Sequence, residues 1–167
     1  MLLLELIRSV PPSSSTESAC ATIEALGFSV GRRLLPLAAS PGAAEPPPAS
    51  PPPPPTLNLA HDLSVVKLLC KEVWAGCFEH QVHKLQTNHR GVFVLKDESF
   101  ALLADLPNPP SPPESLRLHC VKVLAFPCGL IRGVLAAAGF AGVVVSCDFK
   151  SDGGDVASCS FNIRISP

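Results

Sequence analysis

Apolar residues recur every three or four positions across residues 62–85, which is the spacing of an amphipathic helix of about six turns. Its apolar side consists of Leu63, Val66, Leu69, Cys70, Val73, Trp74, Cys77, Phe78, Val82 and Leu85. Charged residues occupy the other side, namely Lys67, Lys71, Glu72, Glu79 and Lys84. Asp62 is a favourable N-cap, and the polar stretch 87–91 predicts the end of the helix.

The residues that follow this helix predict a β-hairpin. Residues 92–95 form a short apolar strand, residues 96–99 a polar turn, and residues 100–106 a second run that can return as the paired strand.

The C-terminal part of the chain contains an apolar stretch, residues 123–145, that has the length of a membrane span. Arg132 near its centre would cost about 2.5 to 3.5 kcal/mol on insertion scales, and Pro127 and several glycines interrupt the stretch. We therefore expect a helix over 114–138 that Gly139 caps, followed by a buried strand over 143–149. Gly129 and Gly133, four positions apart, would let another helix backbone approach closely.

A second hairpin ends the chain. Residues 150–155 are rich in Asp and Gly and predict the turn. Residues 158–165 alternate apolar and polar side chains, as a half-buried strand does. The expected fold class is therefore α+β, with helices packed on a small antiparallel sheet of about four strands.

Residues 36–56 differ in composition from the rest of the chain, because they hold ten of its nineteen prolines and a single charge, Glu45. Such a segment buries too little apolar surface to offset its ordering entropy, and we expect a disordered or polyproline II insertion. The chain as a whole, residues 1–167, is then one domain with this insertion. A proline-motif ligand is the less favoured alternative, since no basic residue flanks the run 51–55.

Charge and cysteine content exclude several classes of function. Only 16% of residues are charged and the formal net charge is −1, so there is no basic stripe for nucleic acid, and association through apolar surface is expected. The seven cysteines show no CxxC spacing, which favours a reducing, cytosolic compartment in which they act as small buried hydrophobes. The apolar N-terminus lacks the basic start and the cleavage site of a signal peptide.

Catalytic and metal-binding motifs are absent from the sequence. It contains no GxSxG, no P-loop and no GxGxxG after a strand. His80 and His83 lie three apart with Glu79 beside them, but no third ligand is close in sequence, so a solvated helical face is the preferred interpretation. We expect no catalytic residues, no metal and no cofactor.

Four segments of the sequence resemble the small subunits of the transport protein particle (TRAPP) vesicle-tethering complex, in their subunit 6 branch. They are DLSVVKLLCKEVW, LQTNHRGVFVLKDESFALL, LAFPCGLIRGVL and, more weakly, IEALGFSVGRRL. The chain departs from the family at Pro127, where the family has threonine, and in residues 56–61, which lack the cysteine that carries an acyl group in some relatives.

The resemblance implies a non-catalytic subunit that forms a heterodimer with a paralogous TRAPP small subunit. The assembled complex would support nucleotide exchange on a Rab-type GTPase in transport between endoplasmic reticulum and Golgi, and the chain would be cytoplasmic and peripheral to those membranes. N-terminal helices form the dimer contact in the family, so we expect the partner interface at Ile23, Leu26, Phe28, Val30 and Leu34. The alternative is a small domain that binds a lipid-like or other apolar ligand noncovalently.

Overall fold

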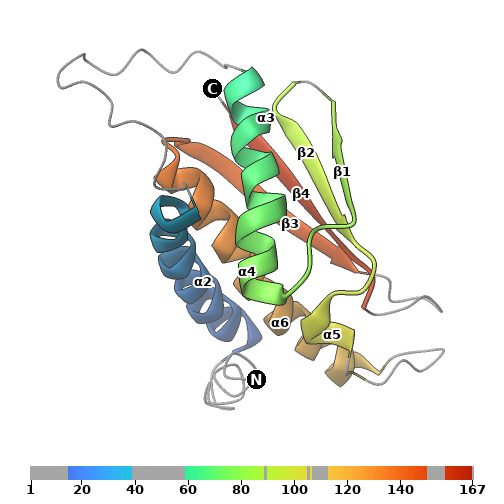
Figure 1. Cartoon of the computed structure of the whole chain (residues 1–167). Coiled ribbons are helices and arrows are strands. Elements are labelled where there is room, and N and C mark those ends of the chain that lie inside the picture. The colour runs from blue at the N-terminus through green and yellow to red at the C-terminus, as the bar shows by residue number, and fades with distance from the viewer. Residues whose placement is uncertain are drawn as a thin grey trace.

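The chain folds into a layer of helices packed on one face of a four-stranded antiparallel sheet (Figure 1). The computed structural model describes residues 15–38, 59–88, 90–104, 106, 113–149 and 157–166. The helices are α2 (Thr16–Ala38), α3 (Leu59–Leu68), the π-helical turn η1 (Leu69–Val73), α4 (Trp74–Phe78), α5 (Ala101–Ala104) and α6 (Glu114–Ala137). The strands are β1 (Lys84–Thr87), β2 (Val92–Asp97), β3 (Gly142–Phe149) and β4 (Cys159–Ser166). The predicted α+β class with four strands is confirmed.

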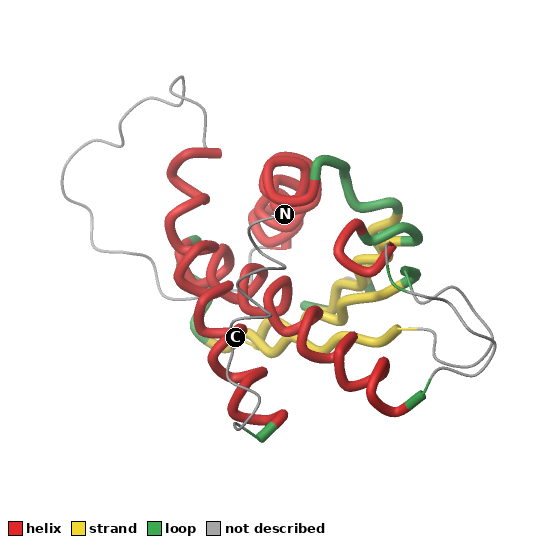
Figure 2. Tube along the Cα trace, turned by 90° about the horizontal axis from the view of Figure 1, so that it is seen from below, coloured by secondary structure: helices red, strands yellow, loops and turns green. Residues whose placement is uncertain are grey.

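The sheet has the strand order β1-β2-β4-β3. The second hairpin, β3 with β4, forms as expected, with Cys147 opposite Phe161 and Phe149 opposite Cys159. The alternation of β4 places Phe161 and Ile163 in the core below the helices, as period-two patterning predicts. Figure 2 shows the described helices gathered on one side of the strands, so no described helix covers the other face of the sheet, called the open face below.

The predicted long helix is shorter at its C-terminus than its hydrophobic period suggested. The helical run α3, η1 and α4 begins at Leu59, so Asp62 lies in its first turn rather than at the N-cap, and it ends at Phe78. Glu79 follows in the left-handed region (φ 64°) and donates its N–H to Ala75 O. Leu85 continues the apolar period of the helix but belongs to β1, opposite Leu95, because period alone cannot tell an apolar strand position from one more helical turn.

The first predicted hairpin was also misplaced. β2 pairs with β1 before it and with β4 after it, and residues 101–104 form the short helix α5 instead of a returning strand. Phe100 and Leu103 are fully buried, so their apolar character reflects packing under α6 and β4 and not strand pairing. The Phe100 N–H bonds to Ala157 O, which holds this segment beside β4.

Helix α6 is confirmed where it was expected. It stays helical through Pro127, and Gly139 (φ 95°) lies immediately beyond its end. By length and composition α6 could cross a membrane, but 67% of its most apolar stretch is buried inside the fold. It lies between α2 and the sheet, which explains why nearly every residue from Val123 to Leu135 is apolar.

The contact between α2 and α6 is built on glycines. A Cβ added at Gly129 would lie 2.0 Å from Glu24 O, and one added at Gly133 would lie 2.2 Å from Phe28 O. Gly27 and Gly31 on α2 play the same part, each with a Cβ position 2.2 Å from a carbonyl oxygen of α6. Residue numbers rise in the same direction along both helices, because Gly129 meets Glu24 and Gly133 meets Phe28, so α2 and α6 pack in parallel. The close approach expected at Gly129 and Gly133 is confirmed. The glycines in α2 do not interrupt it, because close packing offsets their low helix propensity.

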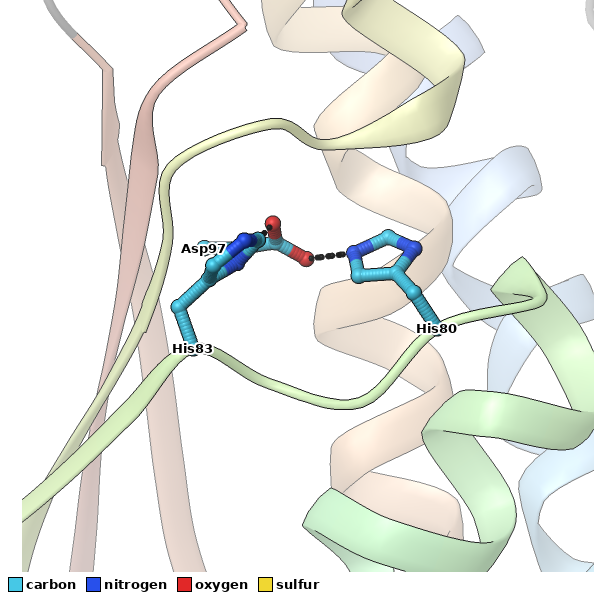
Figure 3. A group of neighbouring side chains, drawn as sticks. All are labelled: His80, His83 and Asp97. Atoms are coloured by element: carbon cyan, nitrogen blue, oxygen red, sulfur yellow. Dashed lines mark hydrogen bonds and ion pairs between the residues drawn. The ribbon is translucent and has the colours of Figure 1, made fainter.

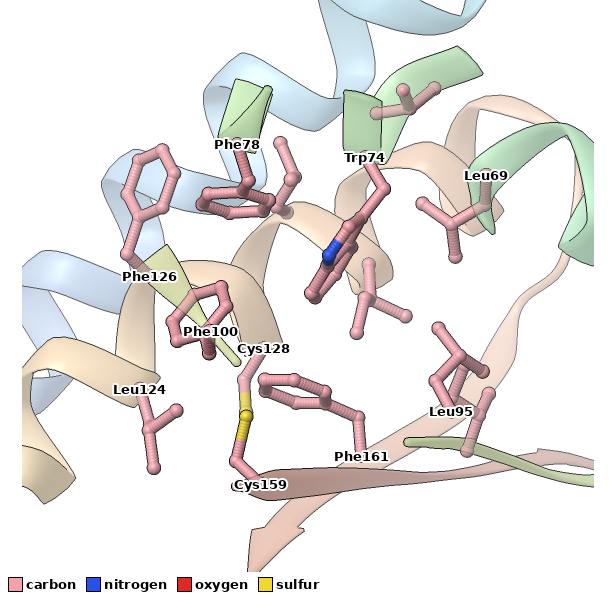
Figure 4. Close-up of a cluster of buried hydrophobic side chains, with 14 of the residues drawn as sticks. Leu69, Trp74, Phe78, Leu95, Phe100, Leu124, Phe126, Cys128, Cys159 and Phe161 are labelled. Carbon is pink, nitrogen blue, oxygen red and sulfur yellow. The ribbon is translucent and has the colours of Figure 1, made fainter. Parts of the chain in front are cut away.

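The core centres on the aromatic cluster in Figure 4. The Trp74 ring lies 4.6 Å from the Phe78 ring and 5.3 Å from the Phe161 ring, centroid to centroid. Cys128 of α6 and Cys159 of β4 point toward one another in the same layer and are both free thiols. Trp74 therefore joins the helical layer to the sheet.

The open face of the sheet is mostly polar. Asn162 of β4 donates to Asp148 of β3 at 2.7 Å, while Val144 is an isolated exposed hydrophobic residue. Two expected features lie outside the described residues, namely the part of the proline-rich insertion after residue 38 and the turn 150–155. The first three insertion residues, 36–38, end α2.

Candidate functional site

Two parts of the structure are candidates for function. One is the surface of α2, where the sequence predicts a partner interface, and the other is a cluster of polar side chains around a buried aspartate.

The structure separates the five predicted interface residues into two groups. Ile23 is 3% exposed and belongs to the core between α2 and the other helices. Leu26 is 37% exposed, and Phe28, Val30 and Leu34 are half-buried. The structure thus places one of the five residues inside the chain's own fold and leaves the others with exposed apolar surface, while the interface itself stays a prediction.

Helix α6 adds two exposed apolar side chains that the sequence analysis did not single out. Leu118 is 37% exposed and Val121 is 41% exposed, and they lie on the N-terminal half of the helix, before its buried stretch. The signal in the sequence was the apolar period of α6, but that period looked like core throughout, because it cannot tell which apolar face the fold covers.

The second candidate is centred on the carboxylate of Asp97, at the end of β2 (Figure 3). Asp97 is completely buried, which is unusual for a carboxylate unless it is bound by donors. Trp74 Nε1 donates to its Oδ2 at 3.0 Å, and the Ser99 N–H donates to its Oδ1 at 3.2 Å. These two bonds fix the orientation of the carboxylate from the core side and from its own turn.

Two imidazole rings close the cluster from the outer side. His80 Nε2 lies 2.7 Å from Asp97 Oδ2, and His83 Nδ1 lies 3.1 Å from Asp97 Oδ1. The His80 side chain is 27% exposed and that of His83 is 40% exposed. The cluster is therefore a buried acid reached from solvent through two histidines.

The backbone places these histidines on a loop and not on a helix. The left-handed turn at Glu79 redirects the chain, and the Val82 N–H bonds to Cys70 O in the π-helical turn. The interpretation of His80 and His83 as a solvated helical face is therefore wrong, since the helix ends at Phe78. Asp97 could not be recognised as a third member from the sequence alone, because it lies 17 residues from His80.

The cysteines are free thiols, and most of them are buried. Burial raises the pKa of Cys70 to about 12 and raises the pKa of Cys77 and Cys120 as well, so these thiols are neutral at neutral pH. The hydrogen bond from Cys128 lowers the pKa of Cys147. A role for Cys70 as a packed hydrophobe agrees with the expectation from its helical position.

The fold has a solved counterpart. The crystal structure of a trafficking protein particle complex subunit 3 from Naegleria fowleri, covalently bound to palmitic acid, superposes with a TM-score of 0.63. The match covers 99% of this chain and 89% of that one at 14% sequence identity, so it shows a shared fold.

Sequence comparison gives the family. The family model described as transport protein particle (TRAPP) component matches residues 1–166, and the chain therefore belongs to the TRAPP component family.

Within that family the chain is similar to subunit 6. It is 29% identical to trafficking protein particle complex subunit 6b of Danio rerio over 164 residues, covering 98% of this chain and 90% of that one. It is 33% identical to subunit 6A of Homo sapiens over 136 residues, covering 81% of this chain and 74% of that one. The resemblance to the subunit 6 branch is thus confirmed.

Proposed function

We propose that this chain is a non-catalytic subunit of a TRAPP-type vesicle-tethering complex and that it binds a paralogous small subunit through α2. Membership of the family supports the first part of the proposal. The second part rests on the apolar surface that α2 and α6 leave uncovered in the isolated chain.

The exposed apolar side chains of α2 and α6 carry the proposal. Leu26, Leu118 and Val121 together form part of the small set of large hydrophobic residues that the described fold exposes. In α2, Phe28, Val30 and Leu34 are half-buried and keep part of their apolar side chains exposed. Apolar helix surface of this kind is favoured at protein interfaces because its burial on association stabilises the complex.

The complex, and not the isolated chain, would support nucleotide exchange on a Rab-type GTPase in transport between endoplasmic reticulum and Golgi. We infer a cytoplasmic location, peripheral to those membranes, and one domain interrupted by the proline-rich insertion.

The alternative function, noncovalent binding of a lipid-like ligand, has less support. The related subunit 3 structure carries covalently bound palmitic acid. A hollow of about 290 Å³ on the present chain is lined in part by Lys96, Glu98 and Asp148, so its walls do not suit an acyl chain.

The heterodimer is tested by co-expressing the chain with each paralogous small subunit and measuring the dissociation constant of the purified pair. Leu26→Asp and Phe28→Asp should each weaken binding by a few kcal/mol, because a charge would be buried without a partner. The matched control is Val144→Asp, which changes an exposed side chain on the open sheet face and should bind normally. Normal binding by both folded α2 variants would place the interface elsewhere.

The non-catalytic role is tested by release of a fluorescent nucleotide from the GTPase. The purified chain at micromolar concentration should not accelerate release, whereas adding it to a complex that lacks it should improve assembly. Exchange requires a surface that displaces the switch regions and the magnesium ion. Clear stimulation by the chain alone would overturn the proposal.

A further inference from the structure

The Asp97 cluster has more hydrogen-bond acceptors than protons at its centre. His80 Nδ1 lies 2.9 Å from Phe78 O, and a carbonyl oxygen can only accept, so this nitrogen carries a proton. A neutral imidazole has one N–H, so Nε2 then presents a lone pair to Asp97 Oδ2, which is also an acceptor and lies only 2.7 Å away. Two acceptors this close require either a proton or a metal ion between them.

His83 faces the other carboxylate oxygen of Asp97 and also has a backbone donor nearby. Its Nδ1 lies 3.3 Å from the Glu98 N–H, which can only donate, and 3.1 Å from Asp97 Oδ1. In the tautomer that carries its proton on Nε2, the single lone pair of Nδ1 can coordinate an ion beside Asp97 Oδ1, and this coordination would replace the long contact with the Glu98 N–H. Both imidazoles can thus direct lone pairs at one carboxylate.

We propose that His80 Nε2, His83 Nδ1 and the Asp97 carboxylate form a site for a divalent transition-metal ion of the zinc class. Two imidazoles and one carboxylate are ligands that zinc prefers, with water in the fourth position. The three ligand atoms lie within 4.8 Å of one another. Ligands of tetrahedral zinc are about 3.3 Å apart. The His80–Asp97 pair at 2.7 Å must therefore open slightly, and the widest pair of ligand atoms must close, to admit the ion.

The groups around the three ligands are those that usually support a metal site. Phe78 O orients His80 by binding the ring nitrogen that does not face the site. Trp74 Nε1–H and the Ser99 N–H orient the carboxylate. Such outer hydrogen bonds fix the tautomer and direction of the ligands. The partial exposure of both histidines leaves a path for the ion from solvent.

A bound ion would fasten the loop after α4 to the end of β2. Without metal, one added proton can do the same by making an ion pair of His80 and Asp97, as their separation allows. The metal-bound cluster and the protonated, metal-free cluster differ in metal content, so a titration with metal distinguishes them. This inference is independent of the proposed role in tethering.

The test uses the full chain, stripped with a chelator, reduced and titrated with Co²⁺, followed by competition with Zn²⁺. We expect one ion per chain, with ligand-field absorption and without the charge-transfer band that thiolate ligands give. His80→Ala and His83→Ala should each weaken binding by about 100-fold or more, since losing even an outer-shell partner costs 10- to 100-fold. His119→Ala on α6 is the matched control and should leave the affinity unchanged.

A second measurement keeps the test independent of absorbance. Zn²⁺ should raise the melting temperature of the wild-type chain and of His119→Ala, and should not raise that of folded His83→Ala. Absence of binding, equal affinity in all variants, or a thiolate band that persists in His80→Ala would each overturn the proposal. A cluster that binds only a proton would show no metal-dependent shift.

Discussion

The contact between α2 and α6 and the cluster around Asp97 join distant parts of the chain by opposite means. The helix contact depends on missing side chains, because Gly27 and Gly129 let two backbones meet. The cluster depends on side-chain chemistry, because a buried carboxylate gathers Trp74 and His80 from a helix and a loop. The difference shows that one fold can fix its elements by shape in one place and by hydrogen bonding in another.

The two regions should also respond differently to substitution. A shape-based contact tolerates no added atom, and the fit of its glycines does not depend on pH or salt. A polar cluster is sensitive to the loss of a hydrogen-bonding group, since a buried donor without an acceptor costs about 1 to 3 kcal/mol.

The largest expected effect is on the helix contact. Gly129→Ala should lower the free energy of unfolding by about 4 kcal/mol, above the usual cost of overpacking, because its Cβ would lie 2.0 Å from the backbone oxygen of Glu24. Urea denaturation followed by circular dichroism measures the change.

The control for this substitution is Gly76→Ala in α4. A Cβ at Gly76 meets nothing within 4 Å, so the change should stabilise the protein by about 0.5 to 1 kcal/mol through helix propensity. Equal effects of the two substitutions would refute the role of shape at the α2–α6 contact.

A smaller loss is expected at the polar cluster. Asp97→Asn should destabilise the chain by about 2 kcal/mol, because an amide cannot accept from Trp74 and Ser99 and also satisfy both histidines. Asp148→Asn changes an exposed carboxylate that also accepts a hydrogen bond, and it should stay within about 0.5 kcal/mol. The comparison fails if both variants unfold at the same denaturant concentration.

The smallest effect is expected where a polar pair lies on the shape-based contact. Arg132 of α6 and Glu24 of α2 form an ion pair at the surface, with side chains 44% and 34% exposed. Arg132→Gln should cost about 0.2 to 1 kcal/mol, and less at high salt. A larger loss in thermal or urea denaturation would mean that charge and not glycine fit holds α2 in place.

The sequence predicts these two regions unequally. Gly129 and Gly133 could be assigned to a close helix contact from their spacing, and the structure confirms it, because a four-residue repeat places both on one helix face. The identity of the partner helix, α2, could be learned only from the three-dimensional structure. His80 and His83 were assigned to a helix because the apolar period continued through Val82 and Leu85, and only tertiary structure ends that helix at Phe78.

Asp97 lay beyond sequence reasoning for a different reason. It follows a strand in a polar run that predicts a turn, and nothing local distinguishes it from a solvated acid. Asp97 is buried because Trp74 contacts it from α4 and because β4 pairs with β2 beside it. Both elements are distant from Asp97 in the sequence. Local patterns therefore predicted elements and the fold class, while the polar cluster depended on contacts distant in sequence.

The parallel pairing of α2 and α6 also bears on how the protein is made. Glu24 and Arg132, which meet across this contact, are separated by 108 residues. Ribosomes add about 5 to 20 residues per second, so α6 is synthesised roughly 5 to 20 s after α2. During this delay the glycine-lined side of α2 has no partner from its own chain and Ile23 is open to water. The helix that is made first therefore docks on its own chain only after α6 has been synthesised.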